Sequence, residues 1–540
     1  MRAVQTDPEI YELEQRVVHH AKAFERTLPE MRFFILDSLE FMSLLEKYVY
    51  PVSPLNIWEG KRMVTRKHRV ETGQEASIYY EVVVQTGNPS YAYLNSTNSP
   101  MMQASVMAHV VGHCEFSELN VLKDSNPDRT EWVIYLSRKV DRARQQMGEI
   151  NYSQFWNACE SFVPMIAPHS QFNLARTVET ESSHQQETDT YVPEEKPIPR
   201  LTPSFGTLDS LMRNVSPETT WQSEMRAKQR QETISRKGFK LKVPCQDVMG
   251  FLCRHAPASQ SERSVLDYIY SVHSTHDFVI RTQIMNEGWA MYWEKKIMTE
   301  LFKEQSVKGI IDYARVFSGV CYPRPYYMRN PYHLGFYLWT HIEELYQDGK
   351  VSLDFHEEIS QDVKNLWKRP TTKTPIQQME HLVKTVTDYE FLRRFLTPEL
   401  VHEFHLNRFS KHQAQQLRIP PDSIVQEDRH NVWIDPEPIK NEMLNFFTHF
   451  HRPRIYLIDT DFQDGGLLLY HRDDGRRLRK DWIKPTLKNL NLIWKAPVYL
   501  LSRNWLYSFS ANLFKETVVT AVRFESILER MRNSEKPFRI

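Results

Sequence analysis

The chain has 540 residues, and its 68 Lys and Arg residues balance its 68 Asp and Glu residues. A neutral total leaves no overall field that would attract nucleic acid or an anionic membrane, so any such partner would need a local charged patch. The sequence is 41% hydrophobic and 12% aromatic. These proportions are typical of a packed protein, and the length allows two or three domains. We therefore expect no nucleic-acid partner.

The N-terminal segment MRAVQTDPE has no apolar core that could act as a secretory signal, and no window approaches the roughly 18 apolar residues of a membrane span. We expect a cytoplasmic protein with no membrane span. Its five cysteines are an odd number and include no CxxC pair. This pattern argues against a disulfide framework and against a structural zinc ribbon.

The first part of the chain combines helices with a strand. Apolar residues at three- and four-residue spacing predict helices over residues 9–26 and 31–48. Residues 79–85 (YYEVVVQ) are rich in β-branched and aromatic side chains and precede a Gly-Asn-Pro turn, which predicts a strand. Helical spacing returns over residues 101–122, where Ser99 and Pro100 mark the start of a helix that carries the segment HVVGH.

The middle of the chain changes in composition. Residues 174–240 are rich in Glu, Thr, Ser, Gln and Pro, and we interpret them as a polar linker or surface insertion. A long helical run over residues 261–304 follows and contains NEGWAMYWE, and another helix follows the pair Asn330 and Pro331.

Three strand patterns near the C-terminus, with a helical segment between the last two, predict a small α+β domain; they lie at residues 454–462, 466–472 and 497–503. The whole chain is then a predominantly helical α+β protein. We divide it into a first core segment, the linker, a second core segment and the C-terminal domain, at residues 1–173, 174–240, 241–400 and 401–540.

His109 and His113 form the most informative chemical pattern. Residues four apart lie on one face of a helix, so both imidazoles can point at a single ion, as in the HExxH zinc enzymes. A catalytic zinc site needs a third protein ligand, and Glu287 in NEGW is the best candidate. The residue after His109 is Val110, where a zinc protease has the glutamate that deprotonates water.

Three other residues are candidates for the missing catalytic base. Glu115 lies about 200° around the helix from His113 and would point away from the metal unless the helix is distorted. Glu294 lies on the same helix as Glu287, and His333 belongs to the segment NPYHLG. The sequence does not fix the distance of either residue from the histidines.

Two alternatives to a zinc site stay open. A His pair at this spacing more often consists of partly buried, hydrogen-bonded side chains, although the small apolar residues around this pair predict a buried helix in which imidazoles need specific partners. Two His and one carboxylate also suit non-haem iron, and the sequence does not distinguish zinc from iron.

Five segments, in this order, resemble the SpoVR proteins, named for stage V sporulation protein R; they are Trp58–Lys61 (WEGK), Asn88–Asn98 (NPSYAYLNSTN), Ala108–Phe116 (AHVVGHCEF), Ile284–Glu294 (IMNEGWAMYWE) and Asn330–Gly335 (NPYHLG). The resemblance continues into the C-terminal segments IYLIDTDF, LLLYHRDDGRRL and APVYLL. It covers nearly the whole chain outside the linker.

The resemblance implies a bacterial cytoplasmic protein that is linked in spore formers to the spore cortex, a peptidoglycan layer, and elsewhere to stationary-phase or stress physiology. A relation of this family to zincin-type metallopeptidases would assign His109, His113 and Glu287 as metal ligands by their motif positions. The leading hypothesis is a zincin-like metal protein that acts on peptidoglycan-related substrates. The alternative is a non-enzymatic regulator or scaffold that binds protein partners, and Val110 favours it.

Overall fold

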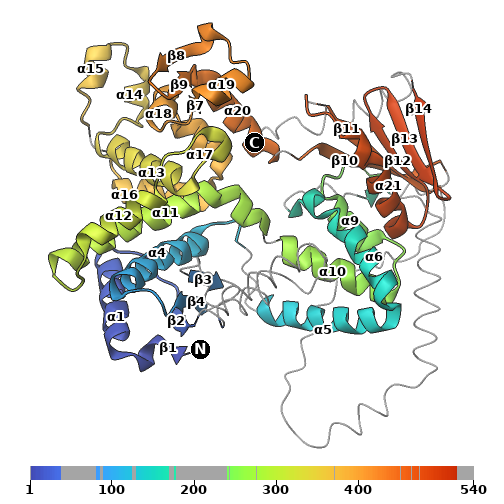
Figure 1. The fold of residues 1–540 in the computed structure, drawn as a ribbon, viewed down its shortest axis with the longest axis horizontal. Helices are drawn as coiled ribbons and strands as arrows, with labels where there is room; N and C mark the ends of the chain where they lie inside the picture. Colours follow the sequence, from blue (N-terminus) through green and yellow to red (C-terminus); the bar gives the residue numbers. More distant parts are fainter. Residues whose placement is uncertain are drawn as a thin grey trace, which may run out of the picture. The chain divides into compact units, whose positions relative to one another are not determined.

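The computed structural model falls into two compact units (Figure 1), formed by Met1–Arg138 with Ser271–Arg452 and by Lys139–Tyr270 with Pro453–Ile540. The structure describes residues 2–37, 40, 81–84, 89–123, 129–168, 176–177, 240–241, 244–274, 276–369, 371–450, 452–463, 465–473 and 475–519. Each unit is described by itself below.

The first unit contains a four-stranded mixed sheet in the order β1-β2-β4-β3, made of Arg2–Ala3, Met31–Leu36, Ser90–Asn95 and Glu81–Val84. Strands β2 and β4 run parallel, and the outer strands pair antiparallel to them. The strand predicted around residues 79–85 is thus confirmed over its described part.

The prediction of a helix over residues 31–48 is wrong for Met31–Leu36, which form β2. Every residue of this segment pairs with β4, from Met31 with Ser90 to Leu36 with Asn95. Its bulky and β-branched side chains (MRFFIL) suit a pleated, half-buried surface, and strand pairing decides between two readings of one short apolar run. Residues 41–48 lie outside the described part of the chain.

Four helices form the centre of the first unit, and they are α1 (Pro8–Ala23), α4 (Pro100–Leu119), α11 (His276–Lys303) and α13 (Pro331–Gln347). Helix α4 begins where the sequence predicts, because the Ser99 side chain accepts a hydrogen bond from the amide of Met102 and Pro100 occupies the first turn. Its residues are buried on nearly every face, so α4 is an interior helix that packs between α1 and α11.

The other described elements of the first unit are mainly shorter helices and a small sheet. The helices are α12 (Ile310–Val320), α14 (Leu353–Glu357), α15 (Gln361–Asn365), α16 (Pro375–Thr385), α17 (Asp388–Phe395), α18 (Pro398–Glu403), α19 (Lys411–Gln416) and α20 (Pro436–His449). The three-stranded sheet has the order β7-β9-β8, from Arg408–Ser410, Asn431–Ile434 and Ile424–Glu427. Short 3-10 turns lie at Val4–Thr6, Tyr326–Met328 and Pro421–Ser423.

The second unit contains α6 (Glu149–Glu160), α9 (Val248–His255) and α21 (Lys480–Trp494), a 3-10 turn at Val163–Met165 and a five-stranded sheet. The sheet has the order β10 (Arg454–Phe462), β11 (Gly466–Arg472), β12 (Val498–Ser502), β13 (Trp505–Ser510) and β14 (Leu513–Val518), and only β11 and β12 pair in parallel. The three C-terminal strands and the helix between them are confirmed. Helices α5 (Arg129–Met147) and α10 (Gln260–Ser274) each run across a boundary between the units.

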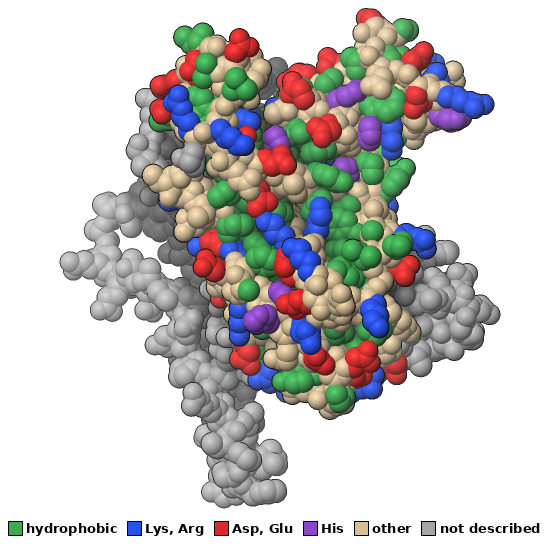
Figure 2. Space-filling model, turned by 90° about the vertical axis from the view of Figure 1, so that its left-hand side faces the viewer, with side chains coloured by type: hydrophobic (Ala, Val, Ile, Leu, Met, Phe, Trp, Pro, Cys, Tyr) green, Lys and Arg blue, Asp and Glu red, His purple; other side chains and the backbone are tan. Residues whose placement is uncertain are grey.

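The predicted α+β, mostly helical class is confirmed. The predicted linker over residues 174–240 lies outside the described residues, apart from residues of the short antiparallel pair β5 (Arg176–Thr177) and β6 (Lys240–Leu241) at its edges. Among the described helices, none is long and apolar enough to cross a bilayer. On the face drawn in Figure 2, acidic and basic side chains are interspersed with apolar ones.

Candidate metal centre

Helix α4 presents His109 and His113 side by side, as their four-residue spacing predicts. Their ring centroids are 4.6 Å apart, and the rings are nearly perpendicular. The two side chains are 9% and 12% exposed. Both imidazoles therefore lie largely out of water, where each ring nitrogen needs a partner.

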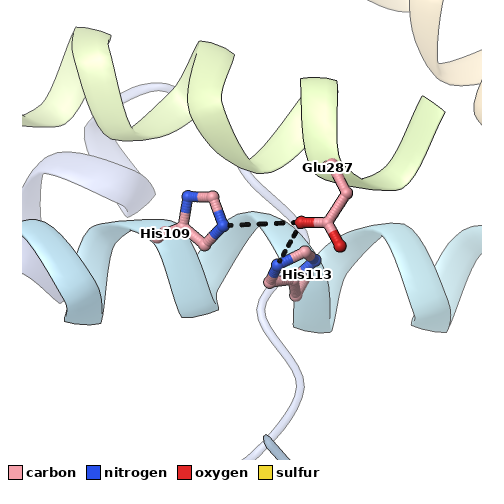
Figure 3. Close-up of side chains that lie close together, drawn as sticks. All are labelled: His109, His113 and Glu287. Atoms are coloured by element: carbon pink, nitrogen blue, oxygen red, sulfur yellow. Dashed lines mark ion pairs between the residues drawn. The ribbon is translucent and has the colours of Figure 1, made fainter. Parts of the chain in front are cut away.

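Glu287 reaches the same point from α11 (Figure 3). Its Oε2 atom is 3.4 Å from His113 Nε2 and 3.9 Å from His109 Nε2. One ligand atom from each of the three residues lies within 4.8 Å of the other two. Ligand atoms that share a tetrahedral zinc ion at 2.0–2.1 Å are about 3.4 Å apart, close to the two distances from Glu287 Oε2 to the histidine Nε2 atoms.

The opposite nitrogen of each imidazole is held by a second residue from α11. His109 Nδ1 is 2.9 Å from Glu294 Oε2, and His113 Nδ1 is 3.0 Å from Asn286 Oδ1. Because both partners are acceptor oxygens, each Nδ1 carries the proton and donates it. In a neutral imidazole with this proton, the lone pair of Nε2 faces Glu287, which is the tautomer that a metal ligand requires.

When both histidines are neutral, three electron-rich atoms face one another at the centre. Oε2 of Glu287 is buried and accepts no well-formed hydrogen bond within the described part of the chain. Burial raises the pKa of Glu287, but His113 and His109 outweigh it and hold this pKa below its usual range. The group is therefore a carboxylate that requires positive charge beside it, either protons on the histidines or a cation.

Glycines allow the three helices of the centre to approach closely. A Cβ atom at Gly112 of α4 would lie 2.6 Å from the Cα of Ala290 on α11. A Cβ atom at Gly288 of α11 would collide with the backbone of Gly335 on α13. The glycines in HVVGH, NEGW and NPYHLG therefore each mark a helix crossing beside the candidate ligands.

Glu294, a candidate base in the sequence, contacts the candidate ligand His109. One oxygen binds His109, and the other accepts a 2.6 Å hydrogen bond from Ser105 Oγ. Its carboxylate also faces the hydroxyl of Tyr313, whose pKa burial and Glu294 both raise. With these partners Glu294 orients His109 and increases its basicity.

Glu115 is also held by other groups. Oε1 contacts the Arg26 guanidinium at 3.3 Å and accepts from the amide of Thr27, and Oε2 accepts from Trp289 Nε1 at 2.9 Å. Burial raises its pKa, and Arg26 opposes this. The side chain is fully buried and joins α11 to the segment after α1, on the side of α4 that the helical angle predicts.

His333 lies among aromatic rings on α13, 4.7 Å from the Tyr337 ring and 5.6 Å from the Phe404 ring. Burial, with a contribution from His405, lowers its pKa to about 4. At neutral pH it is therefore an uncharged packing residue. Its neighbour Tyr332 is the residue of NPYHLG that faces the centre, with its ring 6.0 Å from that of His109.

The sequence interpretation assigned no role to Asn286 and Ser105, although a signal for each exists. Ser105 is four residues before His109, and so shares its helix face. Glu294 follows Glu287 by seven residues, or two turns, and is therefore also on its face. Asn286 adjoins Glu287 in the sequence. Outer partners of histidine ligands could thus have been sought among polar residues on the ligand faces.

A sequence model of the family described as "SpoVR like protein" matches residues 5–434. The chain is also similar to the uncharacterized protein YcgB of Escherichia coli (strain K12), with 21% identity over 493 residues and 87% of each chain covered. No solved structure matches the chain. Of the five segments that carry the resemblance, Trp58–Lys61 lies outside the described residues.

The matched range contains every residue of the candidate metal centre and of its outer partners. It also spans most of the chain, from before α1 to the end of β9. The chain therefore belongs to the SpoVR family.

Proposed function

We propose that this protein binds one divalent metal ion through His109 Nε2, His113 Nε2 and a Glu287 carboxylate oxygen. The observation that carries the proposal is the convergence of these atoms while Glu294 and Asn286 hold both Nδ1 atoms. Hydrogen-bonded imidazoles backed by a carboxylate or an amide are the usual surroundings of metal-bound histidines.

The charges of the site favour a divalent ion. Glu287 and Glu294 supply two carboxylates in a largely buried region, with side chains 21% and 8% exposed. Two negative charges balance one M²⁺ ion, which removes the cost of burying them unpaired. Three protein ligands leave at least one position for water or substrate, as in catalytic rather than structural zinc sites.

The proposed activity is metal-dependent hydrolysis of an amide in a peptidoglycan-related substrate, by a zincin-like protein in the cytoplasm. A bound zinc ion would polarise the amide carbonyl and lower the pKa of a water toward about 7. His109 and His113 would hold the ion, and Glu294 and Asn286 would keep their rings in place. The substrate class and the links to spore cortex and stress rest on the family resemblance alone.

A non-enzymatic regulator is the second candidate, and one observation favours it. Val110, at the position of the protease glutamate, is fully buried and has no proton-accepting group. Glu115 and Glu294 are engaged by the contacts described above. In that case the metal would stabilise the crossing of α4 and α11, and the protein would act by binding partner proteins.

Metal analysis of the untagged full-length protein tests the centre. We expect close to one equivalent of zinc or iron in the wild type, and much less in His109→Ala and Glu287→Ala. His412→Ala is the matched control, because His412 is an exposed residue that contacts Gln416 on α19. Equally low metal in all four proteins, before and after incubation with either ion, would reject the proposal.

Turnover assays then separate the two candidates. Peptidoglycan precursors would be incubated with wild-type protein loaded with zinc or with iron, and the products followed by mass spectrometry. Hydrolysis that disappears in Glu287→Ala supports the enzyme. Metal binding without turnover across a broad set of precursors favours the regulator.

A further inference from the structure

Helix α11 is interrupted before it reaches the candidate metal centre. Thr282 has non-helical backbone angles (φ −127°, ψ 15°), and its hydroxyl donates to the carbonyl of Phe278. A break of this kind starts a new helical segment, whose first amides have no carbonyl four residues earlier to accept them. Buried amides of this type need another acceptor.

Asp388, at the start of α17, supplies that acceptor. Its Oδ2 atom accepts from the amide of Ile284 at 2.8 Å, and its Oδ1 atom accepts from the amide of Met285 at 2.9 Å. Asp388 is completely buried. A carboxylate at the N-terminus of a helical segment is also favoured by the helix dipole. Each carboxylate oxygen thus accepts a hydrogen bond from one of two adjacent amides of α11, a helix about a hundred residues earlier in the sequence.

The segment that Asp388 caps carries every contribution of α11 to the centre. Asn286 and Glu287 follow Met285 directly, and Glu294 comes two turns later. The carbonyl of Met285 accepts from Trp339 Nε1 at 3.0 Å, so this residue is held through both its amide and its carbonyl. The Trp339 ring packs on Phe391 of α17, 4.7 Å away.

We propose that Asp388 is a positioning residue of the metal centre. It fixes where the second segment of α11 begins, and therefore where the Glu287 carboxylate and the partners of both histidines stand relative to α4. This inference rests on the proposed metal site. It goes beyond that site because the hydrogen bonds of Asp388 go to the backbone amides of Ile284 and Met285, while its charge acts on Glu287 only at a distance.

The test is a competition assay with a chromogenic chelator, using Zn²⁺ and the full-length protein. Asp388→Asn keeps the shape of the side chain but replaces one acceptor oxygen with an NH₂ group that faces a backbone amide. We expect about tenfold weaker Zn²⁺ binding, the lower end of the effect of losing an outer partner of a metal ligand. The assay is run well below the unfolding temperature and above the pKa of Asp388, which burial raises to about 7.

Asp247→Asn is the matched control, because Asp247 is another completely buried helix cap. It accepts from the amides of Gly250 and Ala167 and from the hydroxyl of Tyr270, all in the second unit. We expect this variant to lose thermal stability and to keep wild-type Zn²⁺ affinity. A loss of affinity in Asp247→Asn equal to that in Asp388→Asn would show a general effect of destabilisation and would overturn the inference.

Two further measurements keep the inference falsifiable. Asp388→Ala removes both acceptor oxygens without adding an opposing NH₂ group, and should also bind Zn²⁺ more weakly than the wild type, even if Asp388→Asn does not fold. The visible absorption of bound Co²⁺ should also change in these variants, because a displaced Glu287 alters the ligand geometry. Wild-type affinity and an unchanged Co²⁺ spectrum in either variant would overturn the role of Asp388 alone. Absence of metal from the wild type would instead overturn the metal centre itself.

Discussion

Helix α4 supplies two candidate ligands from one unbroken helix, whereas α11 supplies the third from a helix that is interrupted at Thr282. The spacing of His109 and His113 follows from helix geometry alone. The position of Glu287 depends on a cap from α17 and on close packing against α13. The two halves of the site therefore differ in what holds them in place.

This difference separates pre-organised from assembled ligands. The α4 histidines should keep their relative geometry whenever α4 is folded. The α11 residues reach the site only when α4, α11, α13 and α17 have packed together. Metal binding should consequently stabilise the packed state, because an ion that binds only the native arrangement adds its binding free energy to folding.

The largest expected effect comes from removing a single candidate ligand, either from α4 or from α11. We expect His113→Ala and Glu287→Ala each to weaken Zn²⁺ binding more than about 100-fold, beyond the range typical of outer partners. Chelator competition measures both affinities. Near wild-type binding by Glu287→Ala would mean that α4 alone holds the ion, and the comparison between the helices would fail.

The next effect concerns the packing that positions α11. Gly288→Ala should lower the free energy of unfolding by about 2–3 kcal/mol, because the new methyl group meets the backbone of Gly335 and a well-packed interior absorbs such overlap poorly. Urea denaturation measures the change. Gly319→Ala is the control, since nothing lies within 4 Å of the added carbon on α12. Its expected effect is a gain of up to about 1 kcal/mol from helix propensity.

A smaller effect should distinguish the outer partners of the two histidines. Glu294→Gln keeps the size of the side chain but removes the charge behind His109, and should weaken Zn²⁺ binding about 10- to 100-fold, or roughly 1.4–2.7 kcal/mol. Asn286→Ala removes a neutral partner of His113 and should cost about tenfold or less. Weaker Zn²⁺ binding by Asn286→Ala than by Glu294→Gln would show that the negative charge beside His109 does not set the Zn²⁺ affinity.

The effect that is smallest near neutral pH lies outside the ligand helices, at His333. Its pKa is about 4 in the folded protein and about 6.5 when unfolded, so between these values the unfolded state binds the extra proton. The contribution of His333 to the free energy of unfolding is fully present above pH 6.5. It falls as the pH drops toward 4, by at most about 1.4 kcal/mol per pH unit.

His333→Phe keeps the ring contacts with Tyr337 and Phe404 and should remove that part of the pH dependence. Chemical denaturation of the metal-free protein at several pH values between 4 and 7 measures it. If the free energy of unfolding of His333→Phe changed with pH as it does in the wild type, His333 would not be buried in its neutral form.

Much of the fold could be predicted because the signals are local. The Ser99 cap and Pro100 mark the start of α4, and the side chains near the C-terminus predict the strands found there. Met31–Leu36 are predicted as helix because the apolar residues of 31–48 follow a helical spacing, and so short a segment fits either structure until its pairing partner is known. The rotation of about 200° around the helix from His113 to Glu115 also follows from local helix geometry alone.

Helix periodicity alone predicts that His109 and His113 share a helix face and that Glu287 lies on a distant helical segment, because this periodicity depends only on nearby residues. The tertiary structure decided that Glu287 meets these histidines, that Glu294 and Asn286 hold their Nδ1 atoms, and that Asp388 caps the segment from another helix. These contacts join residues about a hundred or more positions apart. They depend on how closely packed helices cross, which periodicity within one helix does not encode.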